Sequence, residues 1–148
     1  MTITLHEKQF RDLTVAELYA LLQVRSAVFV VEQNCVYQDM DSDDQPSVHL
    51  WLTDDAGTIL ALCRVCPAGT HMEEVSIGRV ITTVRGQGYG RRIMLAAIET
   101  ARTRFSATRI DLEAQEYARG FYEQVGFRQS SAPFLLDGIP HIRMTLLL

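Results

Sequence analysis

The 148-residue sequence has no long apolar run. Stretches such as Ala27–Val31 are far shorter than the about 20 residues that a transmembrane helix needs. The first segment, Met1–Phe10, also lacks the apolar core of a signal peptide, because Glu7 lies where that core would be. We therefore expect a cytoplasmic protein that does not associate with a membrane.

An excess of basic residues is also missing. The 14 lysine and arginine residues are outnumbered by 18 aspartate and glutamate residues, which gives a formal net charge of −4. A chain of this charge offers no broad positive surface to duplex nucleic acid or to anionic lipid. We expect no nucleic-acid partner, although Arg85, Arg91 and Arg92 form a local basic cluster.

Cysteine is scarce, and the three cysteines cannot all pair with one another. This argues against a secreted disulfide scaffold. Cys63 and Cys66 form a C-x-x-C motif, but they lie in an expected strand, where positions three apart point to opposite faces. No second Cys/His pair has zinc spacing, so we predict no metal site. Cys35 is interpreted as a buried small residue rather than a nucleophile.

The remaining composition, 47% hydrophobic and 22% charged, is typical of one soluble domain, and we assign residues 1–148 to it. A run of strands is followed by a helix, a strand, a second helix and a closing strand. This order predicts an α+β fold with mixed pairing around one strand–helix–strand unit. The expected strands are 2–10, 48–53, 58–66, 75–83, 109–113 and 142–148, and the expected helices begin at the Thr14/Glu17 capping box, near Gly88 and at Tyr117.

An acidic segment, Asp39–Gln45, is predicted to be a loop. Its D-x-D-x-D spacing is similar to that of a calcium loop, but Asp44 replaces the turn glycine and Leu50 stands where the last ligand should be. We therefore predict a solvated loop. The alternative is a patch that attracts a cationic substrate.

A glycine-rich segment, Arg85–Arg92, directly follows an expected strand and opens an expected helix. Glycines allow a tight turn and close approach of a ligand, and the free N–H groups of a helix N-terminus bind phosphate oxygens. The alternative is a tight loop without a ligand. Asp111 and Glu113 lie near the position that a ribose-binding acid has in a dinucleotide site. Such a site is nevertheless disfavoured, because Arg91 replaces the third glycine of G-x-G-x-x-G and the chain that follows is too short for the further strand–helix–strand units of that fold. A P-loop is excluded because Gly-Lys-Ser/Thr is absent.

The R-x-x-G-x-G pattern of this turn is followed by Phe121–Phe127 (FYEQVGF), and together they resemble the GNAT family of acetyl-CoA-dependent N-acetyltransferases. Residues 24–44, 77–80 and 137–144 resemble the ElaA-type subgroup, so the resemblance covers nearly the whole chain. It implies one α+β domain with a mixed central sheet of about six to seven strands and about four helices. It also implies that two strands splay apart before the glycine turn.

The resemblance assigns acetyl-CoA as cosubstrate, with no metal. The backbone of Val80, Ile81 and Thr82 would pair with the pantetheine arm, and an amide near the splay would polarise the thioester carbonyl. Gln115 stands where the family often has a cofactor-contacting asparagine. The pyrophosphate would be held by the backbone amides of Arg85, Gly86, Gln87, Gly88, Tyr89, Gly90 and Arg91.

Tyr122 matches the family tyrosine that protonates the departing thiolate, a reasonable task for a phenol. The alternative is an aromatic residue packed in the core. Candidates for the base that takes a proton from the incoming amine are Glu32, His141 and Glu113, and each could instead have a structural role. His49 is interpreted as structural.

The resemblance implies transfer of an acetyl group to a primary amine by direct attack in a ternary complex, since no cysteine matches a nucleophile position. One alternative is a non-catalytic acyl-CoA-binding sensor or partner module. Another is lactone-signal synthesis, because Arg25–Phe29 (R-x-x-V-F) faintly resembles such enzymes. The acceptor could be a small polyamine-like amine, an amino sugar, an amino acid or a protein N-terminus. The apolar closing segment, Thr145–Leu148, could form a homodimer contact.

Overall fold

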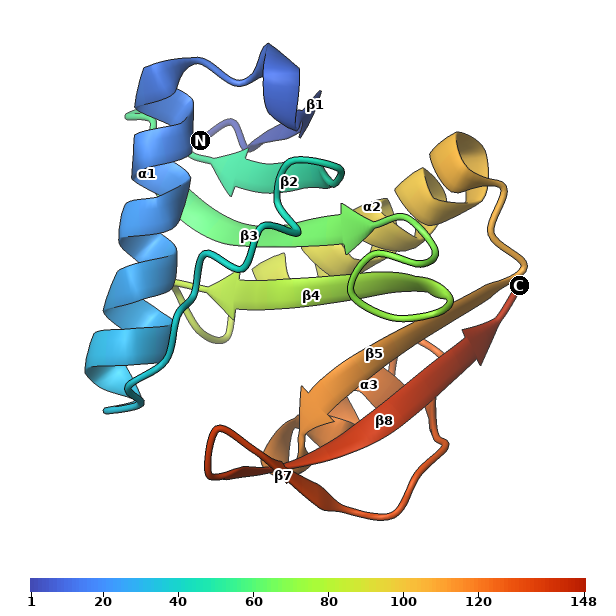
Figure 1. Cartoon of the computed structure of the whole chain (residues 1–148). Coiled ribbons are helices and arrows are strands. Elements are labelled where there is room, and N and C mark those ends of the chain that lie inside the picture. Colours follow the sequence, from blue (N-terminus) through green and yellow to red (C-terminus); the bar gives the residue numbers. More distant parts are fainter.

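A single sheet of eight strands organises the chain in the computed structural model, which describes all residues 1–148 (Figure 1). The strands run in the order β1-β2-β3-β4-β5-β8-β6, and β7 pairs with β8 beside this path. The α+β fold predicted from the sequence is confirmed. The strands are β1 (Thr4–Gln9), β2 (Val48–Thr53), β3 (Ile59–Cys66), β4 (Val75–Thr82), β5 (Arg109–Gln115), β6 (Arg128–Gln129), β7 (Phe134–Leu136) and β8 (Ile139–Leu147). The α-helices are α1 (Val15–Arg25), α2 (Tyr89–Phe105) and α3 (Arg119–Glu123).

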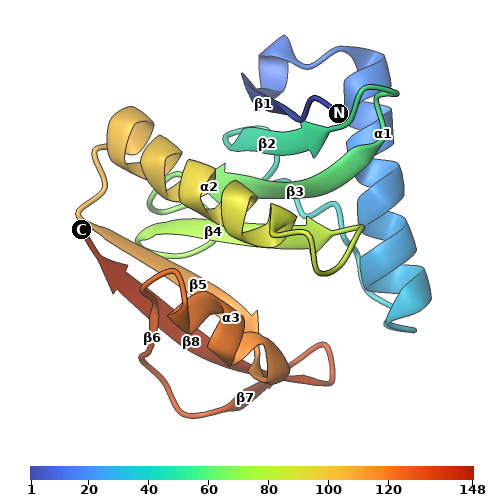
Figure 2. The same cartoon turned by 180° about the vertical axis from the view of Figure 1, so that it is seen from behind.

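Helices cover both faces of the sheet. Figure 1 shows α1 against one face, and Figure 2, seen from behind, shows α2 and α3 against the other. The alternation of side chains along β2 explains the two packed layers. Leu50 and Leu52 belong to the main core with Ile93 of α2, whereas Trp51 joins a smaller cluster with Leu21 of α1.

Helix α1 begins at the predicted capping box. The Thr14 side chain accepts a hydrogen bond from the amide of Glu17, and the Glu17 carboxylate accepts one from the amide of Thr14. The helix then continues as a π-helical segment, Ser26–Glu32, which the sequence pattern did not predict. Single π-helical turns are frequent at functional sites, and this one lies beside the cavity described below.

The C-terminal hairpin was not predicted from the sequence, because its first strand, β7, has only 3 residues. Strand β8 begins at Ile139 rather than at residue 142, and its first residues pair with β7. The turn between them is Asp137-Gly138, and both residues have positive φ (51° and 76°). An Asp-Gly pair with this backbone is the favoured two-residue connection of a β-hairpin.

Strands β4 and β5 splay apart, as the resemblance implied. They are parallel neighbours, but they pair only at Val75 with Ile110 and at Ser76 with Asp111. Beyond these pairs the two strands diverge (Figure 1), so the later part of β4 has no partner on its β5 side. A register irregularity between β3 and β4, with a φ of 54° at Arg79, bends β4 at the same place.

None of the helices has the length and apolar character that crossing a membrane requires.

Candidate functional site

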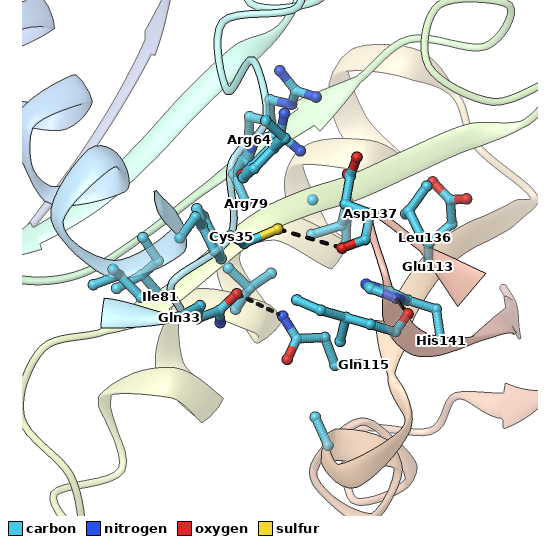
Figure 3. Close-up of a pocket in the computed structure, with 18 of the residues that line it drawn as sticks. Gln33, Cys35, Arg64, Arg79, Ile81, Glu113, Gln115, Leu136, Asp137 and His141 are labelled. Atoms are coloured by element: carbon cyan, nitrogen blue, oxygen red, sulfur yellow. Dashed lines mark hydrogen bonds between the residues drawn. The ribbon is translucent and has the colours of Figure 1, made fainter. Parts of the chain in front are cut away.

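A large cavity of about 1190 Å³ lies in the splay between β4 and β5 (Figure 3). Its walls come from the segment after α1, from β3, β4 and β5, from α3 and from the β7–β8 hairpin. The cavity brings together many residues that the sequence singled out. These are Glu32, Val80, Ile81, Thr82, Arg85, Glu113, Gln115, Tyr122 and His141.

The wall formed by β4 presents unused backbone groups. On its other side β4 pairs with β3, with Ile81 opposite Leu62 and Thr82 opposite Ala61. Toward the cavity the same residues have no strand partner, because pairing with β5 stops at Ser76. Free N–H and C=O groups along an exposed strand edge can pair with an extended ligand that carries amides.

The glycine turn has the backbone that a phosphate site needs. Gly86 and Gly88 have φ of 76° and 77°, and α2 begins directly after Gly88. The first amides of this 17-residue helix have no side-chain cap, so they are available to an anion. Arg85 lines the cavity, whereas the side chain of Tyr89 is buried in the main core. The residues Gly86, Gln87, Gly88, Tyr89, Gly90 and Arg91 do not line the cavity but lie beside it at the end of β4.

Gly90 allows α2 to approach β4 and α3 closely. A Cβ atom added there would lie 3.0 Å from Oγ1 of Thr82 and 3.2 Å from the ring of Phe121. Gly90→Ala is therefore expected to lower the free energy of unfolding by about 1–3 kcal/mol, as overpacking does. Urea unfolding measures this loss. The matched control is Gly120→Ala, since a Cβ at Gly120 meets nothing within 4 Å; an equal loss in both variants would contradict the prediction.

Tyr122 lies on α3 with its ring packed in the core and its hydroxyl without a protein partner. The ring makes edge contacts with Phe121 and Phe127, at centroid distances of 5.0 and 6.3 Å. Burial raises the pKa of the Tyr122 hydroxyl, so it stays protonated at neutral pH. A protonated phenol that lines the cavity can donate a hydrogen bond or a proton to a bound ligand. The ring is therefore packed in the core as the alternative interpretation has it, and the catalytic role of the hydroxyl stays a prediction.

His141 is held in one tautomer. Its side chain is buried (8% exposed), and Nδ1 lies 2.7 Å from the carbonyl oxygen of Ile139. A carbonyl only accepts, so Nδ1 carries the proton and Nε2 has a free lone pair. Nε2 has no partner within the protein, and the residue lines the cavity. This arrangement suits a proton acceptor.

Glu113 is less suited to that task because it is already paired. Its carboxylate lies 2.8 Å from Nε2 of His71, whose Nδ1 lies 3.1 Å from Asp43. The hydrogen bond with Glu113 raises the pKa of His71, and the same contact lowers the pKa of Glu113. His71, in the loop between β3 and β4, was not singled out from the sequence. Its partners are far apart in the chain, so no local pattern indicates it.

Gln115 connects the two sides of the cavity. Its amide nitrogen donates to the side-chain oxygen of Gln33 at 3.2 Å (Figure 3). Nearby, the thiol of Cys35 donates to the carbonyl oxygen of Asp137 at 3.5 Å. Both contacts link the segment after α1 to the β5–β8 half of the sheet.

The acidic segment is a buried ion-pair network rather than the solvated loop that we expected. Arg25 binds Asp39 and Asp44, at 3.0 and 2.8 Å. Arg64 binds Asp44 and Asp41, at 2.9 and 2.8 Å, and is 1% exposed. Arg79 also reaches Asp39 and Asp41. The arginines lie on α1, β3 and β4, so the network fixes the segment across three elements and pairs with Asp39 and Asp41, two of the three carboxylates of the D-x-D-x-D spacing.

His49 has a structural role in this network, as predicted. Its Nε2 lies 2.9 Å from the carbonyl oxygen of Asp44, and burial lowers the pKa of the imidazole. The three cysteines are free and buried, and burial raises the pKa of Cys63 and Cys66. High thiol pKa values disfavour the thiolate that a nucleophile needs.

Comparison with known proteins places this geometry in a family. Residues 12–148 match the family model described as an acetyltransferase (GNAT) domain. A UPF0039 protein of Schizosaccharomyces pombe is 42% identical over 94% of this chain and 93% of its own, and protein ElaA of Escherichia coli is 40% identical over 90% and 89%. The crystal structure of an acyl-CoA N-acyltransferase from Pseudomonas aeruginosa superposes with a TM-score of 0.90 at 39% identity, covering 98% of this chain and 99% of that one.

A more distant structure bears on the lactone alternative. A CoA-dependent acyl-homoserine lactone synthase, solved with SAM and isopentyl-CoA, has a TM-score of 0.79 over 99% of this chain and 83% of its own. At 15% identity this likeness concerns the fold alone. The similarity of the whole chain to the nearer relatives decides the assignment: the chain is an acyltransferase of the GNAT family and belongs to its ElaA-type subgroup.

Proposed function

We propose that this protein transfers an acetyl group from acetyl-CoA to a primary amine by direct attack in a ternary complex. One observation carries the proposal. The unpaired edge of β4 lines the cavity and is followed by a glycine turn at the start of a helix. The same cavity is lined by Tyr122 and His141, whose hydroxyl and Nε2 have no protein partner. A cosubstrate with a phosphate group at one end, amides in its middle and a thioester at the other fits this arrangement. Its phosphate matches the glycine turn, its amides match the edge of β4, and its thioester matches Tyr122 and His141.

Each part of this wall has a binding task. The amides at the start of α2 and the guanidinium of Arg85 hold phosphate oxygens. The backbone of Val80, Ile81 and Thr82 pairs with the pantetheine amides, as an added strand would. Gln115, already tied to Gln33, lies where it can contact the cosubstrate.

His141 and Tyr122 carry out different proton transfers of the reaction. His141 takes a proton from the incoming ammonium at Nε2, and the free amine then attacks the thioester carbonyl. A backbone amide of the β4 edge stabilises the oxyanion that develops. As the C–S bond breaks, Tyr122 donates its proton to the sulfur, and the remaining proton on nitrogen returns to Tyr122 through solvent. Glu32 is exposed and has no partner, so no interaction orients it as a base.

Thiol release tests the proposal. Purified protein with acetyl-CoA is expected to release free thiol with at least one class in a panel of primary amines. A non-catalytic acyl-CoA-binding module predicts the opposite, namely binding of CoA in calorimetry with no thiol release from any amine. That result would overturn the proposed activity.

Arg85→Ala is expected to raise the KM for acetyl-CoA about tenfold, because one charge-assisted contact to phosphate is lost. kcat is expected to change less than about twofold, since Arg85 lies away from the reacting atoms. The control is Arg102→Ala, an exposed arginine near the far end of α2. An unchanged KM in Arg85→Ala would show that this arginine does not bind the cosubstrate.

A further inference from the structure

The charged side chains that line the cavity fall into two groups. Most are already neutralised by protein partners: Arg64 and Arg79 bind the acidic segment, and Glu113 binds His71. Arg85, beside the glycine turn, has the phosphate task described above. The charged groups that remain, with no hydrogen bond or ion pair from their side chains, are two carboxylates, Glu32 and Asp137.

These two carboxylates belong to exposed residues that line the same cavity. Glu32 ends the π-helical segment after α1, and Asp137 is the first residue of the β7–β8 turn. The segments that carry them are in contact: Cys35 donates to the carbonyl of Asp137, and Gln33, next to Glu32, binds Gln115 (Figure 3). Because these contacts cross between the two halves of the site, the cavity suits a slender molecule better than a protein surface.

The position of His141 indicates where the reacting nitrogen lies. Its side chain is 8% exposed, and its unpartnered Nε2 faces the cavity. Along β8, His141 is two residues from Ile139, where the turn that holds Asp137 ends. Two residues of strand span about 7 Å, so the backbone of His141 lies about the length of a short aliphatic chain from the end of this turn. Apolar side chains that can pack against such a chain line the same cavity, among them Val28, Phe29, Leu136 and Ile139.

We propose that the acceptor is a small aliphatic diamine whose second ammonium group lies between the carboxylates of Glu32 and Asp137 while its reacting nitrogen lies at Nε2 of His141. This inference rests on the proposed function. The reacting nitrogen loses one proton to His141 and a second on forming the amide, as the C–S bond breaks and the thiol leaves. The second ammonium stays protonated throughout. It serves only for binding, so it lowers KM without changing the chemical step.

The reason to expect a cationic acceptor lies in the cavity rather than in the acidic segment. The acidic segment Asp39–Asp44 was the sequence-based reason to favour a cationic acceptor, but its buried carboxylates are matched by arginines. The carboxylates that favour a cationic acceptor are instead those of Glu32 and Asp137, which no local sequence pattern distinguishes. A neutral monoamine would leave them unpaired, and an amino acid would bring its own carboxylate against them.

Steady-state thiol release separates these acceptors. The panel is 1,4-diaminobutane, n-butylamine of the same chain length, and 4-aminobutyrate, which carries a carboxylate instead of the second ammonium. We expect kcat/KM to be at least about tenfold higher for the diamine than for n-butylamine, with 4-aminobutyrate the poorest. Glu32→Gln and Asp137→Asn are each expected to raise the KM for the diamine about tenfold, with kcat within about twofold. Asp12→Asn, an exposed carboxylate outside the cavity, is the control.

Three results would overturn the inference. Equal kcat/KM for the diamine and n-butylamine would exclude recognition of a second charge. A lower kcat in Glu32→Gln with unchanged KM would make Glu32 the base instead of a binding group. Thiol release with none of the amines in the wider panel would overturn the proposed function, and this inference with it. The first two results leave the proposed function intact, so the two failures are distinguishable.

Discussion

Tyr122→Phe is expected to lower kcat about a hundredfold with little change in the KM for acetyl-CoA. General-acid catalysis contributes about 10²–10⁴ in rate, and removing the hydroxyl leaves the thiolate to depart without a proton donor. The ring contacts with Phe121 and Phe127 do not involve the hydroxyl, so the variant is expected to fold normally. Thiol release at saturating amine measures kcat, and thermal unfolding checks the fold.

A second tyrosine provides the control. Tyr117 also lines the cavity but is 83% exposed, and it has no counterpart in the FYEQVGF motif. Tyr117→Phe is expected to keep kcat within about twofold of the wild type. If Tyr122→Phe retained the wild-type kcat with the same acceptor, the hydroxyl of Tyr122 would not be the acid, whatever the role of its ring.

Asp44→Asn is expected to lower the free energy of unfolding by about 3–5 kcal/mol. Asp44 is 6% exposed and binds two buried arginines, Arg25 and Arg64. Replacing its carboxylate leaves two buried positive charges less compensated, and breaking a buried pair from one side costs about this much. Equilibrium unfolding in urea measures the change.

The neighbouring Asp43 supplies a matched control in the same segment. Its carboxylate is 23% exposed and pairs only with His71, so Asp43→Asn is expected to cost no more than about 1 kcal/mol. Similar losses in the two variants would contradict the assignment of Asp44 as the centre of the network.

The Asp44 effect also has a defined pH dependence. Burial alone would raise the pKa of Asp44, but the hydrogen bonds and charges of Arg25 and Arg64 outweigh it and lower the pKa. A carboxyl with a lowered folded-state pKa stabilises the fold above its unfolded value of about 3.9, and this contribution is lost as pH falls through the folded-state pKa. The difference between wild type and Asp44→Asn is therefore expected to be largest near neutral pH and to shrink in acid.

Local features of the site were predictable from the sequence. The capping box at Thr14 and Glu17 and the glycine turn at the start of α2 depend on a few adjacent residues whose backbone preferences are strong. The same holds for the hairpin turn after β2 and for the short helix that carries Tyr122. Motif spacing then indicated the family, which comparison with known proteins confirmed.

Contacts between distant segments could not be predicted. The acidic segment was interpreted as solvated because its partners, Arg25, Arg64 and Arg79, lie on three separate elements. The pairing of His71 with Glu113 was missed for the same reason, and it explains why Glu113 is a weaker candidate for the base than His141.

The sequence by itself determined the fold class, the family and the segment suited to a phosphate group, because these depend on local backbone preference and on the spacing of motifs. Only the tertiary structure decided which charges stay free in the cavity. Whether a carboxylate is neutralised depends on which arginine or histidine the fold brings within about 4 Å of it. The splay of β4 from β5, and the crossing contacts of Gln33 and Cys35, set those distances. They leave the carboxylates of Glu32 and Asp137 without a protein partner among the residues that line the cavity.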